Sequence, residues 1–511
     1  MAVGAAALGV GWLLAGPNFA GYRVHTFDLG LYARTAWDWS HGIHNAGDVQ
    51  AAIPKSLERP ALSTHFDLWL ILLGPVVRLF GAQALLWAQL LAPLWGFWGL
   101  YRVGVQWSGG GWLGLGWVLC AATGFGLYHA WAFPYHSEVI GWSFLPWWWW
   151  ALMQPGRRTG LRWLFLAGML AAKEDMGLHM AFVAATVAWL HPPSANPHLR
   201  RDALWDAGIA GTYALLVLGW WMPAWAGGGA VSNIDHGPPA AWIDAWNSGS
   251  GSRILAATAE LFRALFLHHG ERPEGVMWKQ EWWQALALSG AWLWLRRPGV
   301  FLMIVPLVAA KMWHDNPMVW GTLKHYNIAL TWLVPLGVGL AWHPTLQGRQ
   351  GPQLGMGLLL GLAVVGSAVA TRGTIYDTRQ WVDRASVDFL HPGHWKPAMS
   401  PEADAEWRRL LPPDAAVSAS HHIVPHLIQQ PVLRGFPDLR DAVYVVVYDF
   451  PKGDAPYTRQ ETMRRVSQLL SSGEWEQRAK TPGLYVLRRV NSQSTTGMSA
   501  AAHSPSTSRN R

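Results

Sequence analysis

Long apolar segments recur along most of this chain, a pattern typical of a protein that crosses a membrane many times. Only 14% of the residues are charged, whereas soluble domains carry roughly 25%. Several segments are shorter than the roughly 20 residues of a straight crossing. The pattern predicts a mainly α, polytopic integral membrane protein with about eleven transmembrane helices, at residues 1–18, 84–103, 110–128, 138–153, 161–172, 177–190, 203–224, 282–295, 299–313, 326–342 and 353–371.

A further apolar stretch, residues 66–80, carries Asp67, Arg78 and an internal Gly74-Pro75. It can be a helix lying at the membrane interface or a full crossing. Basic residues decide between the two, because Lys and Arg in short loops stay cytoplasmic.

With the N-terminus in the cytoplasm and residues 66–80 at the interface, nine basic residues fall in short inside loops and two, Lys173 and Lys324, in short outside loops. A crossing at 66–80 would invert this bias, so the interfacial interpretation is favoured, with large outer loops at 19–83 and 225–281. The nine inside residues are Arg102, Arg157, Arg158, Arg162, Arg200, Arg201, Arg296, Arg297 and Arg349.

Residue 372 marks a change in composition, which separates a transmembrane domain, 1–372, from a polar region, 373–490. That region is predicted to be a small extracytoplasmic α/β domain, and 491–511, rich in Ser, Thr and Ala, a disordered tail. The expected elements are a helix at 401–411, strands at 416–420 and 442–448, a helix at 458–470 and a strand at 483–488.

The net charge of +8 is spread over many short loops. No basic stripe interleaves with exposed aromatic residues, so nucleic acid is not an expected partner. Cys120 is the single cysteine and lies in an apolar run, which suggests a packed thiol. The N-terminus lacks the basic region and small-residue cleavage site of a signal peptide.

Asp28 lies about ten residues after the first apolar segment, between Phe27 and Leu29. A carboxylate at the rim of a membrane protein can act as a general base on a membrane-adjacent substrate. The structural alternative is that Asp28 caps a short interfacial helix beginning at Leu29, because Asp is a favoured N-cap residue.

Further polar clusters fall on the same predicted outer face, and charges in an apolar chain often mark a polar cavity. Each cluster has a plain alternative as a solvated loop, a helix cap or a satisfied interfacial histidine. We expect Asp28, His65, Glu138, Lys173 and His325 to surround one cavity beneath the C-terminal domain. The clusters are Ser63 to Asp67, Tyr135 to Glu138, Lys173 to Asp175, His314-Asp315 and Lys324 to Tyr326.

The order of these short motifs resembles that of the bacterial predicted membrane proteins of the domain-of-unknown-function 2079 family, over about residues 20–450. Members commonly read His-Pro-Glu where this chain has His136-Ser137-Glu138. The matching motifs are Thr26-Phe-Asp-Leu-Gly30, His65-Phe, His136-Ser-Glu138, Lys173-Glu-Asp175, His325-Tyr326, Pro413 to Ser420, Val424-Pro-His-Leu427 and Phe436-Pro437.

That family in turn resembles the polytopic glycosyltransferases of the C-type fold, which include the protein mannosyltransferases and aminoarabinose transferases. Their plan has an acidic residue in the first outer loop, interfacial helices after it, many crossings and often a C-terminal outer domain. They use polyprenyl-phosphate sugars as donors. The resemblance therefore implies a sugar donor on a polyprenyl phosphate and a location in the bacterial inner membrane.

The leading hypothesis is transfer of a sugar from a polyprenyl-phosphate donor to an acceptor hydroxyl on the outer face, with Asp28 as the general base. Cationic side chains would hold the phosphate, and Mg²⁺ is a conceivable but not required cofactor of the acidic groups. The candidate cations are Lys173, Lys324, His325 and Lys311. The candidate substrate-binding residues are His65, His136, Glu138, Lys173, Glu174, Asp175, Lys324, His325 and Tyr326.

Two alternatives stay open. The same buried charges could line the pathway of a transporter or flippase for a lipid-linked or small polar solute, although the sequence has no obvious internal repeat. The chain could also be an envelope scaffold whose outer domain binds a protein partner. The concentration of polar motifs on one face argues against the scaffold.

Overall fold

The computed structural model describes residues 2–24, 26–43, 62, 65–154, 159–191, 197–225, 237–267, 275–346, 350–376, 383–454 and 456–490. Arg157, Arg158 and Arg349 of the basic-residue count, Ser63 of the polar clusters and the expected tail at 491–511 lie outside these ranges.

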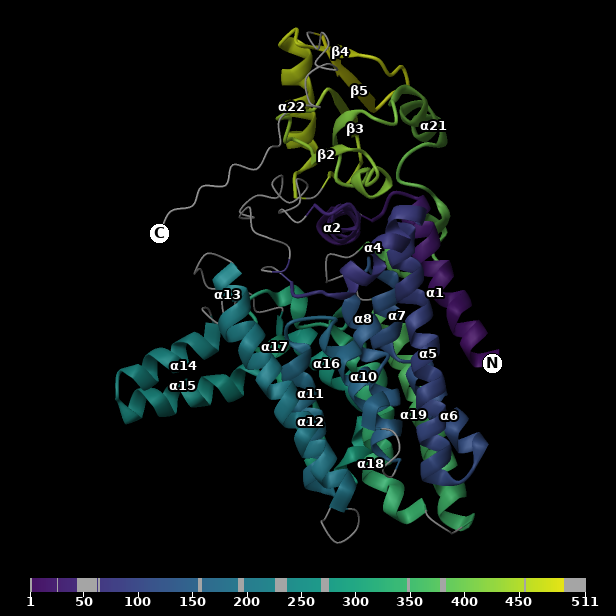
Figure 1. The fold of residues 1–511 in the computed structure, drawn as a ribbon, viewed down its shortest axis with the longest axis vertical. Coiled ribbons are helices and arrows are strands. Elements are labelled where there is room, and N and C mark those ends of the chain that lie inside the picture. Colours follow the sequence, from purple (N-terminus) through teal and green to yellow (C-terminus); the bar gives the residue numbers. More distant parts are fainter. Residues whose placement is uncertain are drawn as a thin grey trace, which may run out of the picture.

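A long helical bundle makes up most of the molecule, and a smaller α/β region sits on one end of it (Figure 1). The helices of the bundle run mostly along its long axis. Their bounds are α1 Ala2–Ala20, α5 Gln83–Ser108, α6 Gly111–Ala122, α7 Phe125–Ala132, α8 Ser137–Trp142, α9 Leu145–Leu152, α10 Thr159–Leu170, α11 Met176–Leu190, α12 Pro197–Leu216, α13 Met222–Trp225, α16 Gly275–Leu288, α17 Val305–Met312, α18 Ile328–Leu346 and α19 Gln350–Ile375.

All eleven predicted apolar stretches are largely helical, but many are broken into short pieces. Among the described residues, three helices are long and apolar enough to cross a membrane, namely Ala2–Ala20, His198–Trp225 and Gln353–Ile375. The pair α6 and α7, bent by 47°, makes a fourth if it is one span. The structure therefore supports a membrane-embedded bundle, and a count of eleven crossings is not confirmed.

The breaks fall at residues that interrupt helices. Gly124 separates α6 from α7, and Gly290, with φ of 108°, ends α16. Pro298 separates the 3₁₀ helices Ala291–Arg296 and Pro298–Ile304, because proline cannot donate the next backbone hydrogen bond. These interruptions explain why apolar content alone overestimates the number of continuous spans.

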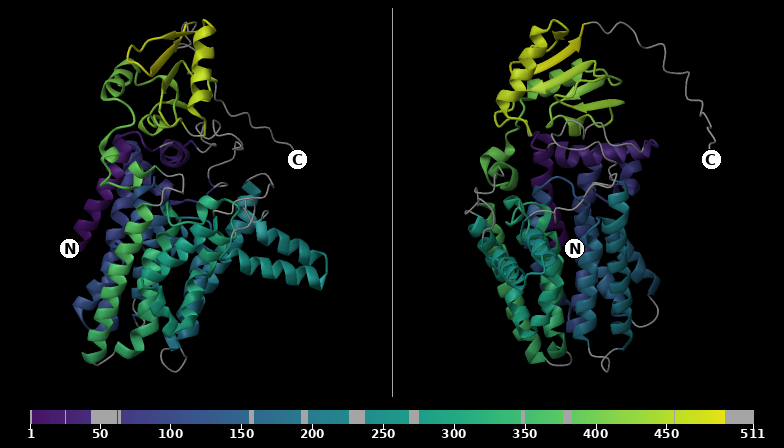
Figure 2. Two further views of the ribbon diagram at one scale, coloured as in Figure 1. Left: turned by 180° about the vertical axis from the view of Figure 1, so that it is seen from behind. Right: turned by 90° about the vertical axis from the view of Figure 1, so that its left-hand side faces the viewer.

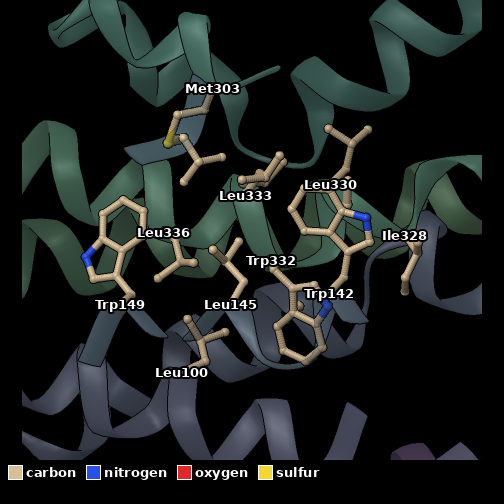
Figure 3. Close-up of a cluster of buried hydrophobic side chains, with 14 of the residues drawn as sticks. Leu100, Trp142, Leu145, Trp149, Met303, Ile328, Leu330, Trp332, Leu333 and Leu336 are labelled. Carbon is tan, nitrogen blue, oxygen red and sulfur yellow. The ribbon is translucent and has the colours of Figure 1, made fainter. Parts of the chain in front are cut away.

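The bundle core is filled by tryptophan and leucine side chains from helices far apart in the sequence (Figure 3). Trp332 and Leu336 of α18 lie near Leu100 of α5 and Trp149 of α9 in this cluster.

Close approach between helices needs small residues. A Cβ added at Gly339 of α18 would lie 1.8 Å from the ring of Trp107, so only glycine admits that ring.

Two short helices lie at the end of the bundle next to the C-terminal region. Helix α2, Leu31–Ser40, crosses that end beneath the α/β region (Figure 2) and packs on α4, Trp69–Phe80. A helix of the 12 residues of α4 is about 18 Å long, which is shorter than the hydrocarbon core. The interfacial interpretation of residues 66–80 fits this length.

A hairpin of α14, Gly237–Asn247, and α15, Gly251–Ala264, projects sideways from the bundle (Figure 2). Its two helices are joined by the Trp242 Nε1 to Thr258 Oγ1 hydrogen bond of 3.0 Å. Trp246 is 60% exposed, and Leu255 is 72% exposed. The hairpin therefore presents an apolar surface outside the bundle.

The C-terminal α/β region, residues 401–489, contains a five-stranded mixed sheet in the order β2-β1-β3-β5-β4. Strand β1 is parallel to β2 and β3, whereas β5 is antiparallel to β3 and β4. The five predicted elements are present, and the short strands β2 and β4 were not predicted. The bounds are α21 Pro401–Leu410, β1 Ala416–Ala419, β2 Val432–Gly435, β3 Tyr444–Tyr448, α22 Arg459–Ser471, β4 Trp475–Gln477 and β5 Leu484–Arg489.

Local signals account for the two helices of this region. Ser400 caps α21 through its side chain, and Pro401 follows at the first helical position. Thr458 and Glu461 form a capping box at the start of α22. The apolar strand β3 is central in the sheet and buried along its middle.

Candidate functional site

Asp28 lies in a π-helical turn, Thr26–Gly30, directly before α2. The N-cap position of α2 is Gly30, and no side chain caps that helix end. The interpretation of Asp28 as a cap of a helix beginning at Leu29 is therefore wrong. Single π turns are rare and often occur at functional sites, so the backbone conformation at Asp28 is of a kind that functional residues often have.

His136 faces Asp28, with 3.6 Å between Nε2 and the carboxylate Oδ1. The backbone around this histidine is held by Gln89 of α5, whose Oε1 accepts from the His136 N–H at 2.7 Å. The Nδ1 atom lies 3.0 Å from the carbonyl oxygen of Pro134. Because a carbonyl only accepts, Nδ1 carries the proton, and Nε2 of the neutral ring is an acceptor directed at Asp28.

His325 stacks face to face on His136, with ring centroids 3.4 Å apart and planes 14° apart. Phe133 packs beside both rings, with its centroid 5.3 Å from that of His325 and 5.4 Å from that of His136, and Tyr326 packs on His325 at 4.2 Å. His325 is 4% exposed. Close stacking of two imidazoles favours neutral rings, because two like charges in a dry site repel.

Lys324 precedes His325 and has a strained backbone, with φ of 64° and ψ of −170°. This region is nearly restricted to glycine, and a lysine there costs about 1–3 kcal/mol. Its ammonium lies 5.3 Å from the centroid of the Phe133 ring. Within the described part of the chain Lys324 forms no ion pair, although it is close enough to Asp28 to feel that charge.

A second group of charges lies where α8, α10 and α11 meet. Lys173 forms an ion pair with Glu138 and lies 4.0 Å from Asp175, which in turn is 3.8 Å from His179. Ser137, the position at which this chain departs from the family motif, donates to the carbonyl of Ala172 at 2.5 Å. The motif 136–138 is thus tied to the turn that carries Lys173.

Glu174 connects this turn to the loop before α4. Its Oε1 lies 3.1 Å from Nδ1 of His65, and its Oε2 accepts from the backbone N–H of Phe66 at 3.0 Å. The Leu68 N–H donates to the Ala171 carbonyl at 2.8 Å. His65 and Lys173-Glu174-Asp175, 108 residues apart in the chain, therefore belong to one assembly.

Tyr32 of α2 joins the two groups. Its ring packs against His65 at 6.3 Å, Tyr135 at 5.7 Å and the edge of His136 at 5.4 Å. It also lies within range of the charges of Asp28, Lys173, Asp67 and Glu138. All ten sequence-predicted site residues consequently lie in one connected network, and the expectation of an enclosed cavity among them stays a prediction.

Four members of this network were missed from the sequence, namely Tyr32, Gln89, Phe133 and His179. Gln89 donates through Nε2 to the carbonyls of Ala130 and Phe133, at 2.9 and 3.0 Å. It is the single polar residue of the apolar run 84–100, apart from tryptophan. A lone amide in a membrane segment was a usable signal. Tyr32 and Phe133 stand among many aromatics and carry no comparable signal.

Burial shifts the ionisation of the central groups. It raises the pKa of Asp28, although His136 and Lys324 oppose the shift, and it raises the pKa of Asp67 to about 7. Burial also lowers the pKa of His136 to about 4 and holds that of His325 well below its usual value. Both stacked histidines are therefore neutral near pH 7, and the predicted cationic role of His325 is not supported.

The predicted cations differ in whether other groups of the protein already bind their charge. Lys311 is 1% exposed and donates to the carbonyls of Val319 and Gly321, at 2.5 and 3.0 Å, which assigns it to holding a loop. Lys173 is paired with Glu138. Lys324 is the cation of the described network whose charge is not already used.

No group of three or more His, Cys, Asp or Glu side chains in the described residues is arranged to hold a metal ion. The acidic residues of the network face Lys173, His65 and backbone N–H groups instead. These contacts do not fit the Mg²⁺ considered from the sequence, and no metal-dependent step is derived.

A surface pocket of about 480 Å³ lies between the end of α1, the α4–α5 turn and the C-terminal α/β region. Its walls include Phe80, Arg408 and His426, and it contains none of the ten candidate residues. It is therefore separate from the polar network.

The fold and the network together define a helical membrane protein with a cluster of ionisable residues at the end covered by an α/β region. The chain belongs to the family of predicted membrane proteins named DUF2079, whose model matches residues 23–486. This confirms the family resemblance drawn from the sequence motifs. No curated protein sequence matches the chain.

Among solved structures, the chain is similar to ArnT from Cupriavidus metallidurans, whose crystal structure is bound to undecaprenyl phosphate. The sequence identity is 12% and the TM-score is 0.46, with 96% of this chain and 98% of that chain covered.

Proposed function

We propose that this protein transfers a sugar from a polyprenyl-phosphate donor to an acceptor hydroxyl group. The observation that carries the proposal is the arrangement of Asp28, His136 and Lys324. It combines two proton acceptors 3.6 Å apart with a cation that has no ionic partner in the described network. The two proton acceptors can bind the hydroxyl group of the acceptor substrate. The cation can bind the anionic leaving group of the sugar donor.

Asp28 is the general base. An acceptor O–H that lies beside this pair, within hydrogen-bond reach of the carboxylate, gives its proton to Asp28 as the oxygen attacks the sugar carbon. The bond from that carbon to the phosphate oxygen breaks, and polyprenyl phosphate leaves with the electron pair. The raised pKa of Asp28 brings it nearer to the operating pH, which favours proton transfer.

Lys324 stabilises the leaving phosphate. The negative charge that develops there needs a nearby cation more than an acid, because polyprenyl phosphate is already stable as an anion. The strained backbone of Lys324 supports this role, since strain of this kind concentrates at functional sites. Lys173, Glu138, Glu174 and His65 form the wall that orients the substrate.

The experiment uses purified protein, a panel of polyprenyl-phosphate sugars and a readout of donor consumption. We expect the wild type to consume at least one donor and Asp28→Asn to lose that activity by about 10²–10⁴-fold while staying folded. Lys173→Gln should mainly weaken donor binding. A fully active Asp28→Asn protein would remove Asp28 from the chemistry.

The proposal also requires a defined topology in the bacterial inner membrane. Arg158 and Arg297 would be cytoplasmic, and Asp28, Ser250 and residues 373–490 would lie outside. The loop-charge bias of the sequence supports this orientation. Single-cysteine labelling in a Cys120→Ala background tests it. An impermeant reagent should reach position 250 in intact cells. Labelling at position 297 but not at position 250 would show that the topology is the reverse of the proposed one.

A transporter or flippase is the second candidate, favoured by the broken helices. Discontinuous helices build the substrate sites of many transporters, and α7, which follows the 47° break, packs against the His325–Asn327 turn. Binding of a lipid-linked donor without consumption, together with its movement across vesicle membranes, would favour this candidate.

A further inference from the structure

The segment that carries Asp28 is anchored to the C-terminal half of the chain on its N-terminal side. The buried Tyr22 hydrogen-bonds Asp404, and its ring packs on His426 at 4.3 Å. Two residues further on, the Val24 carbonyl lies 3.2 Å from Nδ1 of His422. Asp28 follows four residues after this contact.

The same segment is anchored on its C-terminal side by Arg34. This side chain is 3% exposed and directs its guanidinium at three carbonyls of one short stretch of the C-terminal α/β region. Its Nη1 donates to Ile428 and Gln430, at 3.0 and 2.5 Å, and its Nη2 donates to Pro431 at 3.2 Å. Asp38, one turn later in α2, balances the charge at 2.9 Å from Nε.

These contacts are specific to an arginine. A guanidinium has several donors in a fixed plane and can serve three carbonyls at once, whereas a lysine ammonium is a single point on a flexible stem. The charge is buried, so its partners are needed. All three carbonyls come from residues 394 or more positions further along the chain.

Asp28 sits between the two anchors, in the π turn Thr26–Gly30, and that turn contacts the Val424–His426 turn of the C-terminal region. The bundle supplies His136 and Lys324 from other elements. Helix α2 also packs on α4 of the bundle, so the distance between Asp28 and these two residues depends on how the C-terminal region and α4 together hold α2.

We propose that Arg34 is a positioning residue for Asp28, and that the C-terminal α/β region acts as a clamp that sets the reactive geometry. This inference rests on the proposed function. Loosening the clamp displaces the base without touching the cation that binds the donor. A displacement of about 1 Å at a reacting group costs on the order of 10²-fold in rate.

The test compares Arg34→Lys and Arg34→Gln with Arg162→Lys, a matched control at a buried arginine paired with Asp202 and Asp206. Amide hydrogen exchange of residues 24–40 is measured in detergent, together with kcat and KM for a donor that the wild type consumes. We expect faster exchange in that segment and a kcat lowered on the order of 10²-fold, with KM unchanged, in both Arg34 variants only.

Each result has a defined meaning. Exchange of residues 24–40 as slow in folded Arg34→Gln as in wild type overturns the clamp, whatever the activity. A KM increase with unchanged kcat overturns the positioning role. If the wild type consumes no donor, the proposed function fails, and the exchange comparison with Arg162→Lys still decides whether Arg34 holds the Asp28 segment.

Discussion

Two of the charged groups that the structure describes in and at the end of this apolar bundle are built differently. In the first, Arg162 of α10 pairs with Asp206 at 3.0 Å and with Asp202, both of α12. Trp148 also donates to Asp206 at 2.9 Å. In the second, Asp28 faces a neutral histidine, and Lys324 rests over an aromatic ring.

The difference distinguishes charges that stabilise the fold from charges that can bind or react with a substrate. The Arg162 group, called the closed group below, pairs its charges with one another and pins α10 to α12. The Asp28 group combines the Asp28–His136 pair with a cation, Lys324, that has no ion pair among the described residues and has a strained backbone. A charge in a membrane protein therefore suggests a functional site most strongly where its partners do not neutralise it.

The largest expected effect is on the closed group. Arg162→Met leaves two carboxylates without their buried partner, so we expect a loss of about 3–5 kcal/mol in the free energy of unfolding. The rate per folded molecule should not change. Denaturation in detergent and a donor-consumption assay on the folded fraction measure the two quantities. A folded variant with a reduced rate would mean that the Arg162 group is not merely structural.

Lys324→Gln should have a smaller effect, on binding. The variant loses one charge-assisted hydrogen bond of about 1.5–3 kcal/mol, which corresponds to roughly 10–100-fold weaker donor affinity. Titration with a polyprenyl-phosphate sugar measures the change. Unchanged donor affinity in Lys324→Gln would show that a cation other than Lys324 binds the phosphate.

Lys324→Gly tests the strain directly. Glycine adopts the positive φ without steric cost, so we expect the thermal stability to rise, by about 1 kcal/mol, while donor affinity falls as in Lys324→Gln. The same denaturation and titration experiments report both changes. A lower stability would show that the lysine side chain contributes more to folding than its backbone costs.

The smallest expected effect is on the pH dependence of the rate. Burial raises the pKa of Asp28, so the base is protonated, and the rate falls, at a higher pH than the ordinary value of about 4 for an exposed aspartate. As the pH is lowered, the rate of donor consumption should therefore begin to decline at a higher pH than it would with an exposed aspartate as the base. A rate that stays constant down to about pH 4 would contradict a buried base.

Much of this architecture was predictable from the sequence. Apolar segment lengths located the helices, and the strands β1, β3 and β5 followed from their runs of apolar residues. Family motifs brought together the ten candidate residues, because each motif is short and local. The edge strands β2 and β4 were missed, since they are only four and three residues long.

The contacts that give the site its character were not predictable. The stacking of His136 on His325 depends on how α7 and α18 pack, and the Arg34 contacts join positions about 394 residues apart. The strain at Lys324 is a backbone property that the residue type does not encode. Sequence patterns therefore pointed to residues that lie together in the structure, whereas tertiary packing decided which contacts they make.

One measurement tests the central claim most directly, namely donor binding and donor consumption determined separately for Asp28→Asn in the same preparation. The account predicts wild-type donor affinity with consumption reduced by about 10²–10⁴-fold, because the base is lost and the cation at Lys324 stays in place. Consumption at the wild-type rate would contradict it, and so would a loss of donor affinity that accounts for the whole decrease.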